Sequence, residues 1–356
     1  MSLRLFVFAF ICVSALGYQT AYAQAAFSVA NWKKDFKTSL KAQDNTKLLE
    51  LVDVVALEKK AIPACSDCEV KENLKKARTQ FAQGKYEEAL ATYQLIPKGN
   101  DMWLQAVEEK GWAQYRLGSP EKAMAQAKTL LSPAFAETVS SEAYFLQSLS
   151  QLKICDYKGV FETHELFKKK QKEHIVKIQD LSMKGLNSDV IKVVSKANEF
   201  PLKLKALGEE ALSLPALFHK DRELQAHILK HNVSAAALDV LKNAETTTLS
   251  ARLQASFEKM NSQAVAGIEA RVQKLAQEET AANKKIINKM NLVEVEAIQR
   301  MHSDLALADE AYSNGQFKNV GADELVFKDD GRPWIDELDK FEVISKACPS
   351  NLRRKM

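Results

Sequence analysis

The chain has 356 residues, of which 46% are hydrophobic and 27% charged, and its net charge is +4. Its 12 glycines and 8 prolines are about 3% and 2% of the residues, against usual values of about 7% and 5%. So few turn-forming residues argue against β-sandwiches, barrels and nucleotide-binding α/β folds. The ample apolar fraction excludes a disordered or collagen-like chain. We therefore predict an all-α fold.

Residues 1–23 have the pattern of a secretory signal peptide. A positive charge at Arg4 precedes the apolar run Leu5–Leu16, and a small–x–small sequence follows at residues 21–23. The apolar run is shorter than the roughly 20 residues that span a bilayer, and no later segment approaches 18 consecutive apolar residues. We expect a periplasmic or secreted mature chain without a transmembrane segment. Retention of residues 1–23 as a membrane anchor is the alternative.

Residues 70–170 contain a sequence that recurs at a nearly constant spacing. GKYEEA, which starts at Gly84, is followed 34 residues later by GSPEKA from Gly118, and a weaker copy, CDYKGV, starts at Cys155. This period, with Gly at the turn between two helices and Ala in the second helix, resembles the tetratricopeptide repeat (TPR) of exported bacterial proteins. Pro120 in place of the turn aromatic and Cys155 in place of the third glycine depart from the family pattern.

The resemblance implies stacked helix–turn–helix pairs whose concave surface binds segments of partner proteins. In the repeat register, Arg78, Gln105, Tyr115 and Arg116 lie on first helices and face that surface. We name these four as candidate partner-binding residues. Because the same face also packs helix against helix, a purely structural role for them is the alternative. For the repeat itself, the alternative is an ordinary helical bundle with a coincidental spacing.

Four cysteines follow residue 23, namely Cys65, Cys68, Cys155 and Cys348. An even number in an oxidising compartment is consistent with two disulfides, and four cysteines allow three pairings. Cys65 and Cys68 have the C-x-x-C spacing of redox catalysts, but the sequence around them lacks a thioredoxin-like strand and helix. We favour structural bonds between Cys65 and Cys68 and between Cys155 and Cys348. The second bond would tie the end of the chain to the repeats.

Helical segments lie on both sides of the repeats. Residues 24–69 hold two stretches with apolar residues at helical spacing, which could extend the repeat array upstream. Residues 171–244 are a further helical region, with a short helix expected at 202–212 between Pro201 and Pro215. Both segments fit the all-α prediction.

Residues 245–314 carry an amphipathic pattern of unusual length. Apolar residues step by three or four along it, which indicates one long helix or two helices joined near residues 280–283. The apolar stripe must be buried in a helical hairpin or in a coiled coil with a second chain. We favour the hairpin, because residues 216–243 offer an adjacent apolar partner. A homodimer through the long helix is the alternative.

The last segment, residues 315–356, differs from the rest of the chain. A turn is expected at residues 329–331, and a short helix starts at Trp334. Trp334 and Phe341 lie seven residues apart on one face of this helix. The sequence WIDEL from Trp334 also looks like C-terminal segments of some secreted bacterial TPR proteins. We therefore expect this segment to be a docking tail.

The sequence offers little support for catalysis, metal binding or nucleic-acid binding. It contains no G-x-G-x-x-G, P-loop or G-x-S-x-G motif. His219, His227 and His231 lack the H-E-x-x-H pattern, and we interpret them as solvated side chains. No basic patch is interleaved with aromatic residues, so we expect no nucleic-acid partner.

These observations together predict an exported, non-enzymatic interaction scaffold of the bacterial cell envelope. We expect it to bind a protein partner and to need no metal or other cofactor. One alternative is a peptidoglycan-associated enzyme of the lytic-transglycosylase type, which would need a lysozyme-like domain with Gly-rich signatures; residues 171–356 contain few glycines. The other alternative is a passive structural spacer.

Overall fold

The structure, a computed structural model, describes residues 26–63, 67–135, 138–245 and 247–303. The expected signal peptide and docking tail lie outside these residues. Within them the chain forms thirteen α-helices and a single antiparallel pair of two-residue strands, β1 (Phe27–Ser28) and β2 (Glu199–Phe200). The all-α prediction is therefore confirmed.

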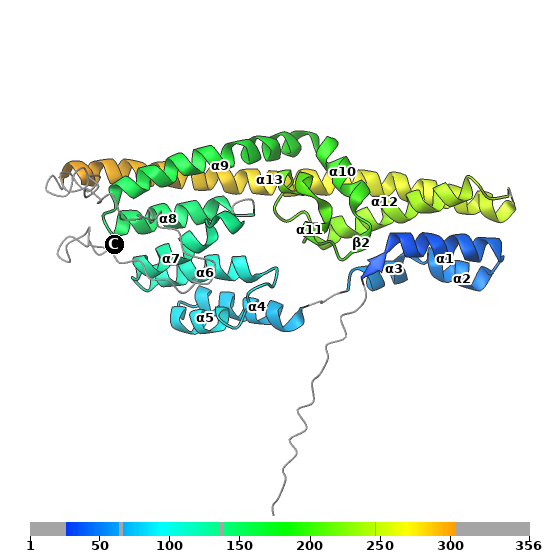
Figure 1. The fold of residues 1–356 in the computed structure, drawn as a ribbon, viewed down its shortest axis with the longest axis horizontal. Helices are drawn as coiled ribbons and strands as arrows, with labels where there is room; N and C mark the ends of the chain where they lie inside the picture. Colours follow the sequence, from blue (N-terminus) through cyan, green and yellow to red (C-terminus); the bar gives the residue numbers. More distant parts are fainter. Residues whose placement is uncertain (1–25, 64–66, 136–137, 246, 304–356) are drawn as a thin grey trace, which may run out of the picture.

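Six helices form three consecutive hairpins on one half of the molecule (Figure 1). In chain order they are α4 (Cys68–Ala82), α5 (Tyr86–Tyr93), α6 (Trp103–Arg116), α7 (Pro120–Leu130), α8 (Ser141–Lys153) and α9 (Tyr157–Lys184). Each of these helices packs against the next one in the chain. We call this stack the hairpin array.

The three hairpins turn in the same way. Gly84, Gly118 and Cys155 stand at their corners with left-handed backbones, at φ of +78°, +77° and +62°. At every corner, the next residue donates its backbone N–H to the carbonyl of the glutamine four residues before the corner, at 2.9–3.0 Å. This is the hydrogen bond of a Schellman motif, which ends a helix by satisfying its last carbonyl groups. Gly84 and Gly118 therefore occupy equivalent interhelical corners, as their 34-residue spacing predicts.

Small residues let the helices of the array approach each other closely. Ala89 and Ala123, near the start of the second helices, are fully buried. Gly111 of α6 faces Leu146 of α8, and a Cβ atom at Gly111 would lie 2.6 Å from Leu146 Cδ2. Since real Cβ atoms do not come so close to another heavy atom, any larger residue at Gly111 would force the Leu146 side chain to move.

The N-terminal helices do not extend the array, contrary to the sequence expectation. The segment forms three helices rather than two, namely α1 (Val29–Lys41), α2 (Asn45–Val52) and α3 (Val54–Ala61). α1 packs on the distant helix α12 (Arg222–Leu241). Trp32 and Phe36 stack with ring centroids 5.1 Å apart, and both contact Phe257 edge-on. Burial of these aromatic rings explains why the segment docks there.

The region before α12 is more irregular than expected. α10 (Ser188–Lys196) is followed by a single helical turn, α11 (Leu204–Leu207), and by a 3-10 helix over Glu209–Ser213. The prediction of one helix at 202–212 is therefore wrong, because the segment is broken near its middle. Gly208 interrupts it with a φ of +84°, a left-handed conformation that ends an α-helix.

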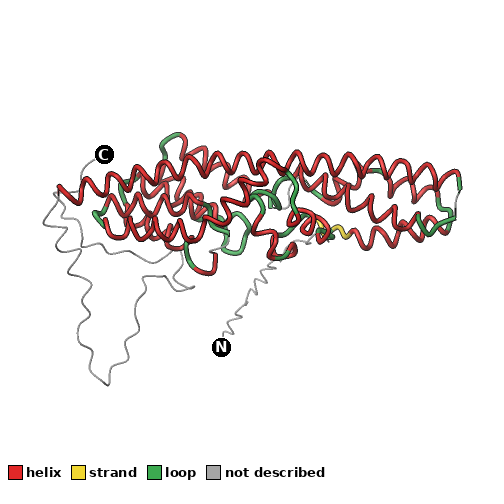
Figure 2. Tube along the Cα trace, turned by 90° about the horizontal axis from the view of Figure 1, so that it is seen from above, coloured by secondary structure: helices red, strands yellow, loops and turns green. Residues whose placement is uncertain are grey.

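One helix, α13 (Thr248–Ser303), runs along the molecule (Figures 1 and 2). Its 56 residues correspond to about 84 Å at 1.5 Å per residue, and it is continuous through residues 280–283. It packs on α12, α9 and α8. The buried stripe includes Ile268, Val272, Met290 and Val293. The long helix therefore buries its apolar stripe within the chain, as the hairpin interpretation predicts.

None of the helices in the described part of the chain is long and apolar enough to cross a membrane. This agrees with the expectation of no transmembrane segment as far as those residues are concerned.

Candidate functional site

The face of the hairpin array that the repeat register singles out is centred on α6. Gln105, Glu109, Trp112 and Arg116 follow one another at steps of four, three and four residues and so share one side of the helix. This side is flanked by Arg78 of α4 and by Glu142 and Phe145 of α8. We call these seven residues the inner face.

Arg78 is held by a neighbouring helix. Its Nε donates to both carboxylate oxygens of Glu109 at 3.0 Å, and its Nη2 donates to Glu109 Oε1 at 2.6 Å. The hydrogen bonds to Glu109 raise the pKa of the Arg78 guanidinium above its usual value. Burial and the same carboxylate raise the pKa of Tyr93. Arg78 thus joins α4 to α6, which is the structural role that the sequence left as an alternative.

Carboxylates gather beside this ion pair. Glu108 accepts a short hydrogen bond from the Ser140 hydroxyl. Burial raises the pKa of Glu108 to about 7, and the nearby carboxylates of Glu142 and Glu109 add to the effect. Burial also raises the pKa of Glu142, although Lys289 of α13 and the Trp112 indole partly oppose the change. This end of the inner face therefore carries negative charge that depends on pH near neutrality.

Toward the hairpin corners the inner face becomes aromatic and cationic. The Trp112 ring lies 5.5 Å from the Phe145 ring and 6.1 Å from the Tyr115 ring, centroid to centroid. Lys153 Nζ lies 6.0 Å from the Tyr115 ring and Lys289 Nζ lies 5.3 Å from the Phe145 ring. These distances are in the range of cation–π contacts. The surface is therefore suited to binding a polypeptide that has both apolar and charged side chains.

The structure brings three of the four predicted binding residues together on α6. Gln105 and Arg116 are exposed, and Tyr115 is half-buried beside Trp112. Arg78 is also exposed in part, but its guanidinium forms an ion pair with Glu109. Gln105 and Arg116 thus have the geometry of contact residues, whereas Arg78 and Tyr115 are engaged within the array.

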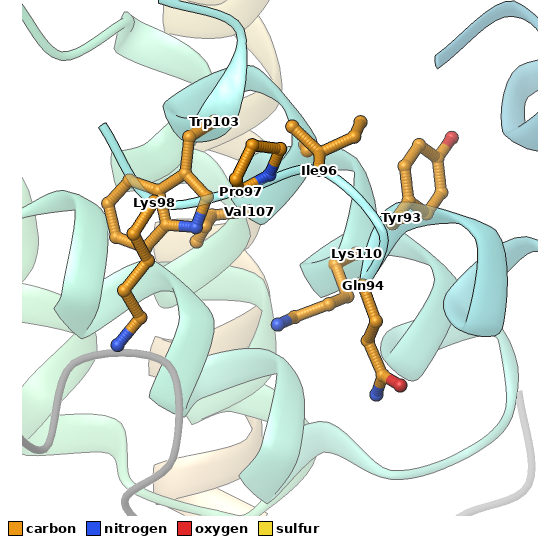
Figure 3. Close-up of a pocket in the computed structure, with 9 residues that line it drawn as sticks. Tyr93, Gln94, Ile96, Pro97, Lys98, Trp103, Val107 and Lys110 are labelled. Atoms are coloured by element: carbon orange, nitrogen blue, oxygen red, sulfur yellow. The ribbon is translucent and has the colours of Figure 1, made fainter. Parts of the chain in front are cut away.

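A cavity of about 180 Å³ opens at the other edge of the array, between the end of α5 and the start of α6 (Figure 3). The residues that line it include Tyr93, Trp103 and Val107. Lys98 and Lys110 extend to the same side of the cavity (Figure 3), and Lys98 Nζ lies 5.9 Å from the Trp103 ring centroid. No sequence signal marks this cavity, because it forms where the connection between two hairpins meets the end of α5 and the start of α6.

A buried polar chain joins three helices near the second half of α13. His164 Nε2 lies 3.0 Å from Ser148 Oγ, and His164 Nδ1 lies 3.0 Å from Glu294 Oε2. The connectivity is that of a serine-hydrolase triad, and no sequence signal links these distant residues. Ser148 is fully buried, however, and lines neither the cavity above nor the shallow one on α4 and α5. A substrate does not reach it, so the contact ties α8, α9 and α13 together.

The three histidines near α12, His219, His227 and His231, each have a different environment. His231 Nδ1 lies 2.8 Å from Asn261 Oδ1, and the His227 ring packs against Gly267. Burial lowers the pKa of His219 to about 4. In the part of the chain that the structure describes, no group of three or more His, Cys, Asp or Glu side chains could hold a metal ion.

Two of the four cysteines lie among the described residues. Cys68 and Cys155 are both disulfide-bonded, whereas Cys65 and Cys348 fall outside the description. The two expected pairings therefore stay predictions.

Comparison of this chain with protein-family models, with curated proteins and with solved structures finds no match.

Proposed function

We propose that this chain is an exported, non-enzymatic scaffold of the bacterial cell envelope whose inner face binds segments of partner proteins. The observation that carries the proposal is the repetition of one corner geometry at Gly84, Gly118 and Cys155. Hairpins that turn and stack alike present their first helices side by side, and such stacks offer extended binding surfaces. The resemblance to TPR proteins belongs to this proposal.

The exposed side chains on α6 support binding at the inner face. Gln105 and Arg116 lie three helical turns apart on the same stripe, and Trp112 lies between them. Arginine and aromatic side chains carry much of the binding energy in known protein interfaces. The carboxylates and lysines around this stripe would pair with charged side chains of a bound segment.

The test compares two double variants of the full chain. Gln105→Ala/Arg116→Ala removes the exposed inner-face side chains without breaking the Arg78–Glu109 pair. Glu72→Ala/Lys76→Ala removes two exposed side chains of α4 on the side away from Arg78 and is the matched control. Each chain is crosslinked in envelope extracts, and its partners are quantified by mass spectrometry.

The proposal predicts that the inner-face variant loses at least one partner that both wild type and control retain. A synthetic segment of that partner should then bind the inner-face variant about tenfold more weakly, as expected for the loss of one hot-spot side chain. Identical partner profiles would contradict the proposal. They would favour the passive structural spacer, a role that the length of α13 supports.

A further inference from the structure

We infer that the cavity between α5 and α6 binds residues 334–342 of the same chain, with the Trp334 ring as the anchor. The inference does not depend on the proposed function. The cavity is lined by Val107 and Lys110, which lie on a different side of α6 from Gln105 and Arg116.

The size and lining of the cavity suit one aromatic side chain. Its volume is about 180 Å³, and engineered cavities of about 150 Å³ bind a benzene molecule. Tyr93 and Trp103 stand on two sides of it (Figure 3). Aromatic walls favour an aromatic occupant, because rings gain from edge-to-face and offset-stacked contacts.

The charges at the cavity favour an acidic occupant from within the chain. Lys98 and Lys110 extend to one side of the cavity (Figure 3), so two ammonium groups lie where an acidic segment would bind. The sequence WIDELDKFE, residues 334–342, places four acidic residues and one lysine beside two aromatic residues.

The chain is long enough for this contact. Residues 304–356 follow the end of α13, and Cys155, at the corner between α8 and α9, is disulfide-bonded. If its partner is Cys348, Trp334 lies 14 residues from that anchor, which an extended chain spans over about 48 Å. The helices of the array are shorter, since the 14 residues of α6 are about 21 Å long. With this disulfide in place, Trp334 can therefore reach the opposite edge of the array.

The experiment is zero-length carbodiimide crosslinking of the full chain, which joins lysines to carboxylates in direct contact. An equal mixture of isotopically light and heavy chains separates contacts within one chain from contacts between two chains. We expect crosslinks from Lys98 or Lys110 to Asp336 or Glu337 within one chain. In Trp334→Ala their yield should fall about tenfold, because the aromatic anchor is lost.

Two further variants make the test specific. Phe317→Ala removes a tail aromatic residue outside residues 334–342 and should leave the crosslinks unchanged. Ala106→Phe fills the cavity from its wall and should abolish them while circular dichroism shows unchanged helix content. Crosslinks of Asp336 and Glu337 only to other lysines, only between light and heavy chains, or at equal yield in Trp334→Ala would each overturn the inference. So would their absence from the wild-type chain.

Discussion

Cys155 and Gly118 occupy the same position in consecutive hairpins, and both hold a left-handed backbone, with φ of +62° and +77°. Glycine adopts this conformation without steric cost, whereas a residue with a Cβ atom does not. The third hairpin nevertheless turns like the second. The corner is therefore imposed by the packing of the paired helices and not by glycine alone.

This relationship predicts the effect of Gly118→Ala. A Cβ atom at Gly118 would have no heavy atom within 4 Å, so the substitution costs only backbone strain, about 1–2 kcal/mol. Urea unfolding followed by circular dichroism should show a free energy of unfolding lower by that amount. Gly118→Asn should cost less, because asparagine enters the left-handed region more readily. Equal stability of wild type and Gly118→Ala would show that the corner is not constrained.

Gly267 is predicted to respond differently, because its constraint is steric. A Cβ atom there would overlap the His227 ring, so Gly267→Ala should destabilise the chain by about 1–3 kcal/mol. In a His227→Ala chain, which lacks the ring, Gly267→Ala should instead raise the free energy of unfolding, since alanine stabilises a helix interior over glycine by about 1 kcal/mol. A double-mutant cycle by urea unfolding measures this coupling. Additive effects of the two substitutions would rule out the contact.

Glu108 is predicted to make stability depend on pH. Burial raises its folded-state pKa to about 7, so the folded chain holds this proton at a pH where the unfolded chain has lost it. The linked stability is complete below the unfolded-state pKa, about 4.3, and is lost as pH rises through about 7. Glu108→Gln should remove a pH-dependent change in the free energy of unfolding of about 3 kcal/mol between pH 4.5 and 8. Exposed Glu87 provides the control, since Glu87→Gln should keep the wild-type profile.

The sequence predicts the features of this fold that local signals encode. The corners at Gly84 and Gly118 follow from glycine at a fixed spacing, and the single long helix α13 follows from an apolar stripe without proline. The docking of α1 on α12 could not be predicted, because the contact of Trp32 with Phe257 joins residues more than two hundred positions apart. Amphipathic patterns state which side of a helix is buried but not which helix covers it.

The side-chain contacts of the candidate site could not be predicted from the sequence either. The repeat register predicts that Arg78 lies on the first helix of its hairpin, yet its bond to Glu109 depends on how closely α4 and α6 approach. Similarly, Ser148, His164 and Glu294 come from three helices and meet only after α13 packs on α8 and α9. Side-chain partners across helices require the interhelical geometry, which a single sequence does not contain.

The contact between Asp221 and Arg271 gives the last prediction, because it joins the first turn of α12 to α13. Asp221 accepts the backbone N–H of Leu224 at 2.8 Å as the N-cap of α12. It also accepts two hydrogen bonds from the Arg271 guanidinium at 2.9 and 2.6 Å. Burial alone would raise the pKa of Asp221, but the bonds from Arg271 and Leu224 outweigh it and the pKa is lowered.

Asp221→Ala should therefore destabilise the chain by about 2–3 kcal/mol, because it removes both the cap and the ion pair. Asp221→Asn keeps a capping oxygen and should cost about half as much. Since the folded-state pKa is below the usual value, the wild-type advantage should be present above about pH 4 and disappear as pH falls through the folded-state pKa. Urea unfolding at pH 7 and pH 3 measures both effects. If alanine and asparagine cost the same at pH 7, the cap contributes nothing and only the pair with Arg271 stabilises the α12–α13 hairpin.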